Sequence, residues 1–343
     1  MTWLTWRQTR AQVYAALATV VALTAIAALT HRHLVRLASG DGPIFDLLTA
    51  SDRRLYYAGV IILAIAPAIV GTFWGAPLVA RELETGTHRL VWNQSVTRTR
   101  WLAFRLAATV TVAAVTVGLL SWSIDWGSSL LDGAQSAESG SLPSRITPVV
   151  FSMRGLVPVG YAALAVTVGV AAGVLVRRTV PAMAITLAVV AVVQIVTPLL
   201  VRPHLAPATT AVMTFDADHL DYIRDTPGSA PPEIALTPGQ SGTWILSNTT
   251  VNAAAQTATL PTWFATCLPM DGSPPVEVSK AEAGSRDPLD DCLARLNDEG
   301  FRQVVVYHPA TDFWPLQWAE TALTLLVASL LAAFSFWRLR SES

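Results

Sequence analysis

The sequence is almost without lysine and poor in charge. Charged residues make up 14% of the 343 residues, and Lys280 is the only lysine among 23 basic residues. Soluble domains carry about 25% charged residues, so this composition favours a membrane protein. A nucleotide-binding P-loop requires a lysine preceded by glycine, because backbone amides cradle the phosphates while the lysine reaches them. Lys280 has no glycine in register before it, which excludes such an ATP site. The net charge of −1 leaves no overall field that would attract nucleic acid.

Metal-ligand patterns and cysteines are also scarce. His31 and His33 have no third ligand nearby in the sequence. We therefore interpret them as part of a solvent-exposed helix end and expect no metal site. The only cysteines, Cys267 and Cys292, both fall in the segment 202–316. Outside the cytoplasm such a pair most economically forms a disulfide. The alternative, a redox or metal pair, lacks a C-x-x-C spacing.

Long apolar runs dominate what is present. A membrane span needs about 20 apolar residues, and six runs approach or exceed that length. They predict an all-α polytopic membrane protein with six transmembrane helices. Pro67, Gly71 and Gly75 predict that the second helix bends or packs closely against a neighbour. The expected spans are 11–29, 57–80, 101–124, 155–176, 180–201 and 317–337.

The other segments complete the expected organisation. Residues 1–10, with two tryptophans and two arginines, predict an amphipathic segment at the inner membrane surface. Residues 31–56 and 125–153 are expected to be outer loops. The segment 202–316 holds most of the acidic residues and predicts a small α+β extracytoplasmic domain between the fifth and sixth helices. Residues 317–343 form the last helix and a cytoplasmic tail, and Glu320 is expected to reach water at its outer end.

Within 202–316, three stretches have recognisable patterns. WILSNTTVN and RQVVVYHPA predict strands. DPLDDCLARLNDEG predicts a helix with Leu289, Leu293 and Leu296 on one face.

The arginines favour one orientation. Short loops on the side of the termini contain ten arginines, and the short loops of the other side contain six. Positive charge accumulates on the cytoplasmic side, so both termini are expected in the cytoplasm. The cysteines agree, since the reverse orientation would put them in a reducing compartment. We expect a multi-pass protein of a bacterial cytoplasmic membrane.

A charged, helix-prone hairpin separates the second and third apolar runs. It reads GAPLVARELETGTHRLVWNQSVTRTRWLAFR over residues 75–105. One interpretation is an ordinary cytoplasmic loop whose arginines set topology. Together with the six-segment layout and the run YHPATDFWPLQWAETALTLLVASLLAAFSFWRLR at 307–340, however, it resembles the ABC-2 family of ABC-transporter permeases. The most similar group is abundant in actinobacteria and pairs a single permease with a separate ATP-binding subunit. The resemblance covers the membrane part and leaves out the middle of 202–316.

The resemblance implies a transport role. The hairpin 81–100 would be the coupling region that sits in a groove of the ATPase. A homodimer of this chain would stand on two copies of the ABC ATP-binding subunit, which would bind ATP and Mg. The chain itself would hold no cofactor and would not be an enzyme. The coupling residues implied in this way are Arg81, Glu82, Glu84, Gly86, Thr87 and Arg89.

The second and fifth spans line the translocation path in that family, which makes Thr72, Trp74, Gln194 and Thr197 path candidates. On the fifth span Thr186 lies on the same face as Gln194 and Thr197, at helical spacing. A glutamine in hydrocarbon needs a partner, so this face makes either a helix-to-helix hydrogen bond or a substrate contact. No feature for docking a binding protein is recognisable, so we expect export, of an amphiphilic small molecule or a lipid-like substrate.

Two other classes compete. A membrane-anchored sensor or adaptor would bind a ligand with its outer domain and signal without transport. An intramembrane enzyme would need paired catalytic groups at membrane depth. Ser121, Ser123 and Asp125 lie at the edge of the third span without a histidine partner, which argues against the enzyme.

Overall fold

The computed structural model describes residues 2–38, 47–85, 97–135, 143–224, 232–239, 242–267 and 288–341. The chain divides into two compact units, Met1–Ala206 with Phe313–Ser343, and Pro207–Asp312. We refer to them as the membrane unit and the strand unit.

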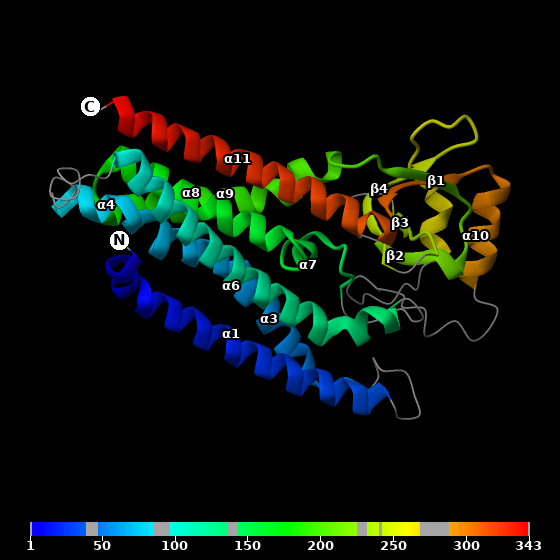
Figure 1. Cartoon of the computed structure of the whole chain (residues 1–343). Helices are drawn as coiled ribbons and strands as arrows, with labels where there is room; N and C mark the ends of the chain where they lie inside the picture. The colour runs from blue at the N-terminus through cyan, green and yellow to red at the C-terminus, as the bar shows by residue number, and fades with distance from the viewer. Residues whose placement is uncertain are drawn as a thin grey trace. The chain divides into compact units, whose positions relative to one another are not determined.

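The membrane unit is a bundle of long helices (Figure 1). Six segments of the described chain are long and apolar enough to cross a membrane, which confirms the predicted number of spans, although the first of them is Leu17–Leu37 and not 11–29. The start of α1 and the end of α11 lie at the same end of the bundle as α4 (Figure 1). The helices are α1 (Thr2–Ala38), α3 (Ala50–Val70), η1 (Gly71–Gly75), α4 (Ala76–Thr85), α6 (Arg98–Gln135), α7 (Pro148–Ser152), α8 (Val157–Val176), α9 (Thr179–Val196), η2 (Thr197–Val201), η3 (Arg202–His204) and α11 (Phe313–Ser341).

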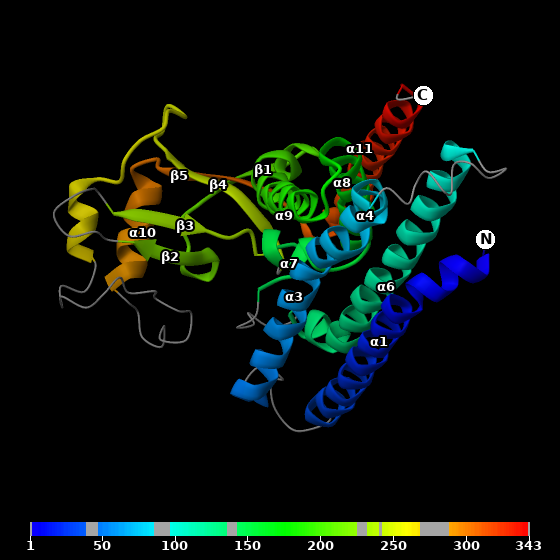
Figure 2. The ribbon, with the colours of Figure 1, turned by 90° about the vertical axis from the view of Figure 1, so that its left-hand side faces the viewer.

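Helix α8 is the centre of the bundle. It contains no charged residue and is buried along almost its whole length, as expected for a helix that is apolar on every side. It packs against α3, α4, α6, α9 and α11, and Figure 2 shows it among these helices. It ends at Arg177, whose φ of 56° lies in the left-handed region.

The second span crosses α8 very closely. Its middle, η1, is a π-helix between α3 and α4, and π-turns commonly occur where a helix is distorted for function. A Cβ atom built on Gly71 would lie 2.6 Å from the Cβ of Ala165, and one on Gly169 would lie 2.5 Å from the backbone nitrogen of Ala76. The glycines therefore let two backbones touch, as predicted from Pro67, Gly71 and Gly75.

Several helices are longer than the apolar runs that predicted them. Helix α1 includes both the expected interfacial segment 1–10, from Thr2 onward, and residues 31–38 of the expected outer loop. Helix α6 continues to Gln135 through residues assigned to the second outer loop. The loop predictions were wrong there because an apolar window marks the part of a helix in hydrocarbon, whereas backbone hydrogen bonding continues into water.

The strand unit combines two small sheets with one helix. Strands β1 (Thr209–Met213), β5 (Arg302–His308) and β4 (Trp244–Val251) form an antiparallel sheet in the order β1-β5-β4. Strands β2 (Leu220–Arg224) and β3 (Glu233–Leu236) form a second antiparallel pair. The predicted strands in WILSNTTVN and RQVVVYHPA are confirmed as β4 and β5, whereas β1, β2 and β3 were not predicted.

Helix α10 (Pro288–Asp298) confirms the predicted helix, and Leu289, Leu293 and Leu296 are buried in the core of the strand unit. A disulfide joins Cys292 of α10 to Cys267 at the end of the 3-10 helix η5 (Thr262–Cys267). The unit is shorter at both ends than the predicted segment 202–316, because residues 202–206 and 313–316 belong to the membrane unit.

Candidate functional site

The predicted coupling residues begin on α4. This ten-residue helix buries Ala76, Val79 and Ala80 and packs against α8 and α9. Its other face is polar, and the side chain of Arg81 is exposed there. Arg81 thus lies on a short amphipathic helix held firmly by the bundle. Gly86, Thr87 and Arg89 lie outside the described residues.

Glu82 connects α4 to α6. Its carboxylate pairs with the guanidinium of Arg105, and both side chains are mostly buried, with exposed fractions of 18% and 15%. Arg105 also donates to the carbonyl of Leu78 at 3.3 Å and lies over the ring of Trp101, 4.9 Å from its centroid. A hydrogen-bonded pair with little solvent is stronger than an exposed one. Glu82 therefore fixes the position of α4 on α6.

Glu84 connects α4 to α9. Its carboxylate accepts hydrogen bonds from the backbone nitrogen of Thr179 at 2.9 Å and from the Thr179 hydroxyl at 2.7 Å. Thr179 is the first residue of α9, and the preceding Arg178 makes no side-chain capping bond. Since the first turn of a helix has unpaired N–H groups and a partial positive charge, Glu84 serves as the cap of α9 from another helix.

The predicted path residues face the inside of the bundle. Thr186 is fully buried and donates to the carbonyl of Ala182 at 2.7 Å. Gln194 donates to the carbonyl of Ala64 on α3 at 2.9 Å. This is the helix-to-helix hydrogen bond that was one of the two interpretations of this face.

The other path candidates are close by in the fold. Thr197 and Thr72 are buried, and Trp74 is half-buried. The hydroxyl of Thr72 lies in the π-helix η1 and makes no hydrogen bond with the described residues. The opposite face of α9 is apolar and exposed, with Ile185, Leu187, Val192 and Ile195 each more than 40% exposed.

Comparison with known families identifies the membrane unit. Residues 8–202 match the family described as ABC-2 membrane transporter related. The chain belongs to this family. The match includes most of α1 and every helix from α3 through η2, and with them α4 and all five path candidates. No protein of curated function matches the chain, and no solved structure matches it.

Membership confirms the predicted resemblance and sets the general role. An ABC-2 related chain is the membrane subunit of a transporter, a class that is generally non-catalytic. It also implies association with an ABC ATP-binding subunit. Among the described residues, no group of three or more His, Cys, Asp or Glu could hold a metal ion.

Sequence reasoning missed the most deeply buried charges of this ABC-2 related subunit. Arg202 and Glu320 are both fully buried. The Arg202 guanidinium donates to the two oxygens of Glu320 at 2.6 and 3.0 Å and to the carbonyl of Pro148 at 2.7 Å. Tyr161 donates to Glu320 at 2.8 Å. The expectation that Glu320 reaches water was wrong, because its fully buried carboxylate is bound by the Arg202 guanidinium of η3 and the Tyr161 hydroxyl of α8.

A second buried arginine lies beside this pair. Arg154, which follows α7, donates to Asp125 at 2.6 Å and to the two oxygens of Asp132 at 2.8 and 2.7 Å. Burial alone would lower the pKa of Arg154, but the hydrogen bonds and charges of Asp132 and Asp125 outweigh it and raise that pKa. Gln317 of α11 accepts from the backbone nitrogens of Leu156 and Val157 at 2.9 and 3.0 Å.

A signal for this cluster was present in the sequence. Glu320 and Gln317 fall in the apolar run of α11, and Arg202 follows directly on the fifth span. Ionisable residues at membrane depth almost always pair with one another. That rule links Arg202 with Glu320 once both are treated as part of the bundle.

Proposed function

We propose that the chain is the permease subunit of an ATP-driven ABC exporter. In this proposal α4 is the coupling helix, its exposed Arg81 contacts a separate ATPase, and movement of α4 passes through Glu82 to α6 and through Glu84 to α9. The observation that carries the proposal is this double attachment of a short, partly exposed helix. A helix linked to two spans transmits a push to both of them.

The remaining parts of the proposal follow from the family. Two copies of this chain form the path, two ATPase copies bind ATP and Mg, and an amphiphilic or lipid-like substrate leaves on the outer side. Both termini and α4 face the cytoplasm of a bacterial cell, and the strand unit lies outside. The two chain ends and α4 lie at one end of the bundle (Figure 1), which supports placing all three on the same side of the membrane.

The experiment is to co-purify the chain with its ATP-binding partner in nanodiscs and to measure ATP hydrolysis with and without amphiphiles. We expect Arg81→Glu to weaken association with the ATP-binding partner or the stimulation of ATP hydrolysis by amphiphiles. The change reverses an exposed charge without breaking a contact that holds α4. The matched control is Arg54→Glu, which reverses an exposed charge at the start of α3, outside α4 and the predicted coupling residues. Unchanged coupling in Arg81→Glu would contradict the role of this face of α4.

The link to α9 has its own test. Glu84→Gln and Thr179→Val each remove part of the same cap, so we expect each to reduce substrate-stimulated hydrolysis while the complex with the ATPase remains intact. The double variant should lose no more substrate-stimulated hydrolysis than the more severe single variant, because both changes act on the same contact. Failure of the chain to co-purify with any ATPase would instead favour a sensor or adaptor whose strand unit binds a ligand.

A further inference from the structure

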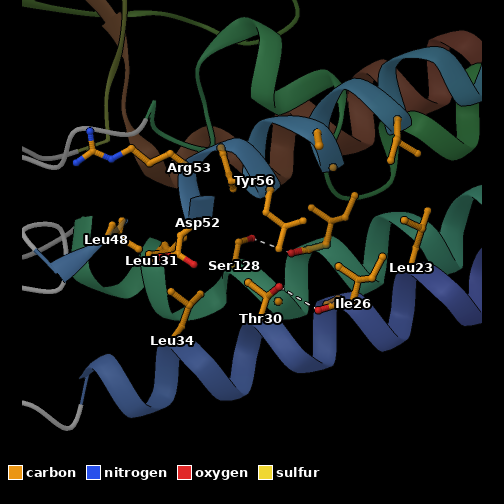
Figure 3. Close-up of a pocket in the computed structure, with 17 residues that line it drawn as sticks. Leu23, Ile26, Thr30, Leu34, Leu48, Asp52, Arg53, Tyr56, Ser128 and Leu131 are labelled. Carbon is orange, nitrogen blue, oxygen red and sulfur yellow. Dashed lines mark hydrogen bonds between the residues drawn. The ribbon is translucent and has the colours of Figure 1, made fainter. Parts of the chain in front are cut away.

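A cavity lies between α1, α3 and α6, away from the predicted coupling and path residues. It has a volume of about 150 Å³. Most of its wall is apolar side chain. Figure 3 labels Leu23, Ile26 and Leu34 of α1, Leu48 just before α3, and Leu131 of α6, and Ile62 of α3 also lines the cavity. Ile26 and Ile62 are 41% and 37% exposed, so the cavity meets the outer surface of the bundle where the spans contact lipid.

Three polar side chains in the wall have hydrogen-bond partners within the protein. Thr30 donates to the carbonyl of Ile26 at 3.0 Å and Ser128 to that of Ile124 at 2.8 Å. The Asp52 carboxylate accepts from the backbone nitrogen of Thr49 at 3.0 Å. Water needs two to four polar partners, and apolar cavities of about this size stay dry and take up hydrocarbon instead. The main body of the occupant is therefore apolar.

One end of the cavity carries two ionisable side chains, Arg53 and Asp52, and the Asp52 carboxylate lies 3.5 Å from Nε2 of His33. Arg53 is exposed and makes no ion pair with a described residue. In Figure 3 its guanidinium lies at the same end as Leu48, and Leu23 marks the opposite end. The occupant thus has a hydrocarbon part and, at one end, a group that suits arginine. Guanidinium groups bind phosphate oxygens through two parallel hydrogen bonds.

We propose that this cavity binds a phospholipid, with one acyl chain between α1, α3 and α6 and its phosphate at Arg53. The bilayer supplies this molecule wherever six spans cross it; its acyl chain suits the apolar wall, and its phosphate suits the exposed guanidinium of Arg53. The site does not depend on the proposed transport function.

The test uses the full chain, stripped of lipid in detergent, with native mass spectrometry and thermal unfolding as readouts. The probes are phosphatidylglycerol, diacylglycerol with the same chains, and inorganic phosphate. We expect only phosphatidylglycerol to remain bound and to raise the unfolding temperature. If diacylglycerol binds and raises the unfolding temperature as much as phosphatidylglycerol does, Arg53 has no role in binding. If inorganic phosphate alone raises the unfolding temperature as much, the site binds an ion and not a lipid. Either result overturns the proposal.

Matched variants locate the site. Arg53→Gln should weaken phosphatidylglycerol binding roughly tenfold, the scale of a lost charged hydrogen bond, whereas Arg54→Gln, beside it but not in the wall, should not. Ala58→Phe should fill the cavity, whereas Ala25→Phe on an exposed face of α1 outside it should not. An equal loss of phosphatidylglycerol binding in Arg53→Gln and Arg54→Gln would overturn the site, and so would unchanged binding by Ala58→Phe. If Ala58→Phe does not fold, the comparison of the two arginine variants decides alone.

Discussion

Arg202 and Glu320 form a fully buried ion pair in a bundle that is otherwise rich in aliphatic side chains. Removing two charges from water is costly, and their attraction offsets that cost only when other hydrogen bonds satisfy the remaining polar atoms. Here Tyr161 and the carbonyl of Pro148 supply those bonds, and the guanidinium also lies 4.3 Å from the centroid of Phe151. The pair connects α11 to the end of the fifth span, two parts of the chain far apart in sequence.

We therefore expect Glu320→Gln and Arg202→Met each to destabilise the membrane unit by about 3–5 kcal/mol, because each leaves one buried charge without its partner. Replacing both residues, by Glu320→Leu with Arg202→Met, should cost clearly less than the sum of the two single changes. Thermal unfolding of the detergent-solubilised chain measures all three. Additive losses would mean that the two side chains do not depend on each other.

Single residues also show where sequence reasoning stopped. Arg81, Glu82 and Glu84 were selected from the charged hairpin, and the exposed position of Arg81 agrees with a surface role. The partners of the two glutamates could not be predicted, because Arg105 and Thr179 come from helices whose packing depends on the whole bundle. The same limit hid the pairing of Arg154 with Asp125 and Asp132, since the two aspartates fell in the expected outer loop 125–153 and Arg154 directly after it.

At the scale of elements, the sequence predicted the number of spans and the close approach of the second one, since both follow from composition and glycine positions. It did not predict which helix would be central. Helix α8 has that place because its Ala, Gly and Val side chains are small, so that other helices approach it on every side. At the contact with η1 and α4, Gly71 and Gly169 on opposite sides let the two backbones approach each other closely.

Gly169→Ala tests this contact. The added methyl would lie 2.5 Å from a backbone nitrogen of α4, so the two helices must separate, and overpacking of this kind costs about 1–3 kcal/mol. Gly118→Ala on α6 is the control, because its methyl would have an ordinary contact of 3.4 Å with Val159 and alanine favours a helix over glycine by up to about 1 kcal/mol. We expect a lower unfolding temperature only for Gly169→Ala. A similar temperature for both variants would show that α4 and α8 have room to move apart.

At the scale of the whole molecule, two units with different chemistry share one chain. The membrane unit is held by close helix packing and a few buried ion pairs, whereas the strand unit has its own core, including Phe215, Phe264 and Val305, and one disulfide. The pattern of the sequence predicted both kinds of unit. It missed β1, β2 and β3 because strands of only four or five residues, two of them with an acidic side chain, resemble surface loops until their partners are known.

The disulfide provides a test of orientation, since Cys267 and Cys292 are the only cysteines of the chain. A membrane-impermeant maleimide applied to intact cells should label the protein only after an impermeant reductant has opened the bond. In a variant in which both cysteines are replaced by serine, Ser341→Cys at the end of α11 should be labelled only after the cells are lysed. Both results together would place the strand unit outside and the end of α11 in the cytoplasm, with α4 at that same end of the bundle (Figure 1). The reverse pattern would put the strand unit in a reducing compartment, where a disulfide does not persist, and would remove Arg81 from the reach of a cytoplasmic ATPase.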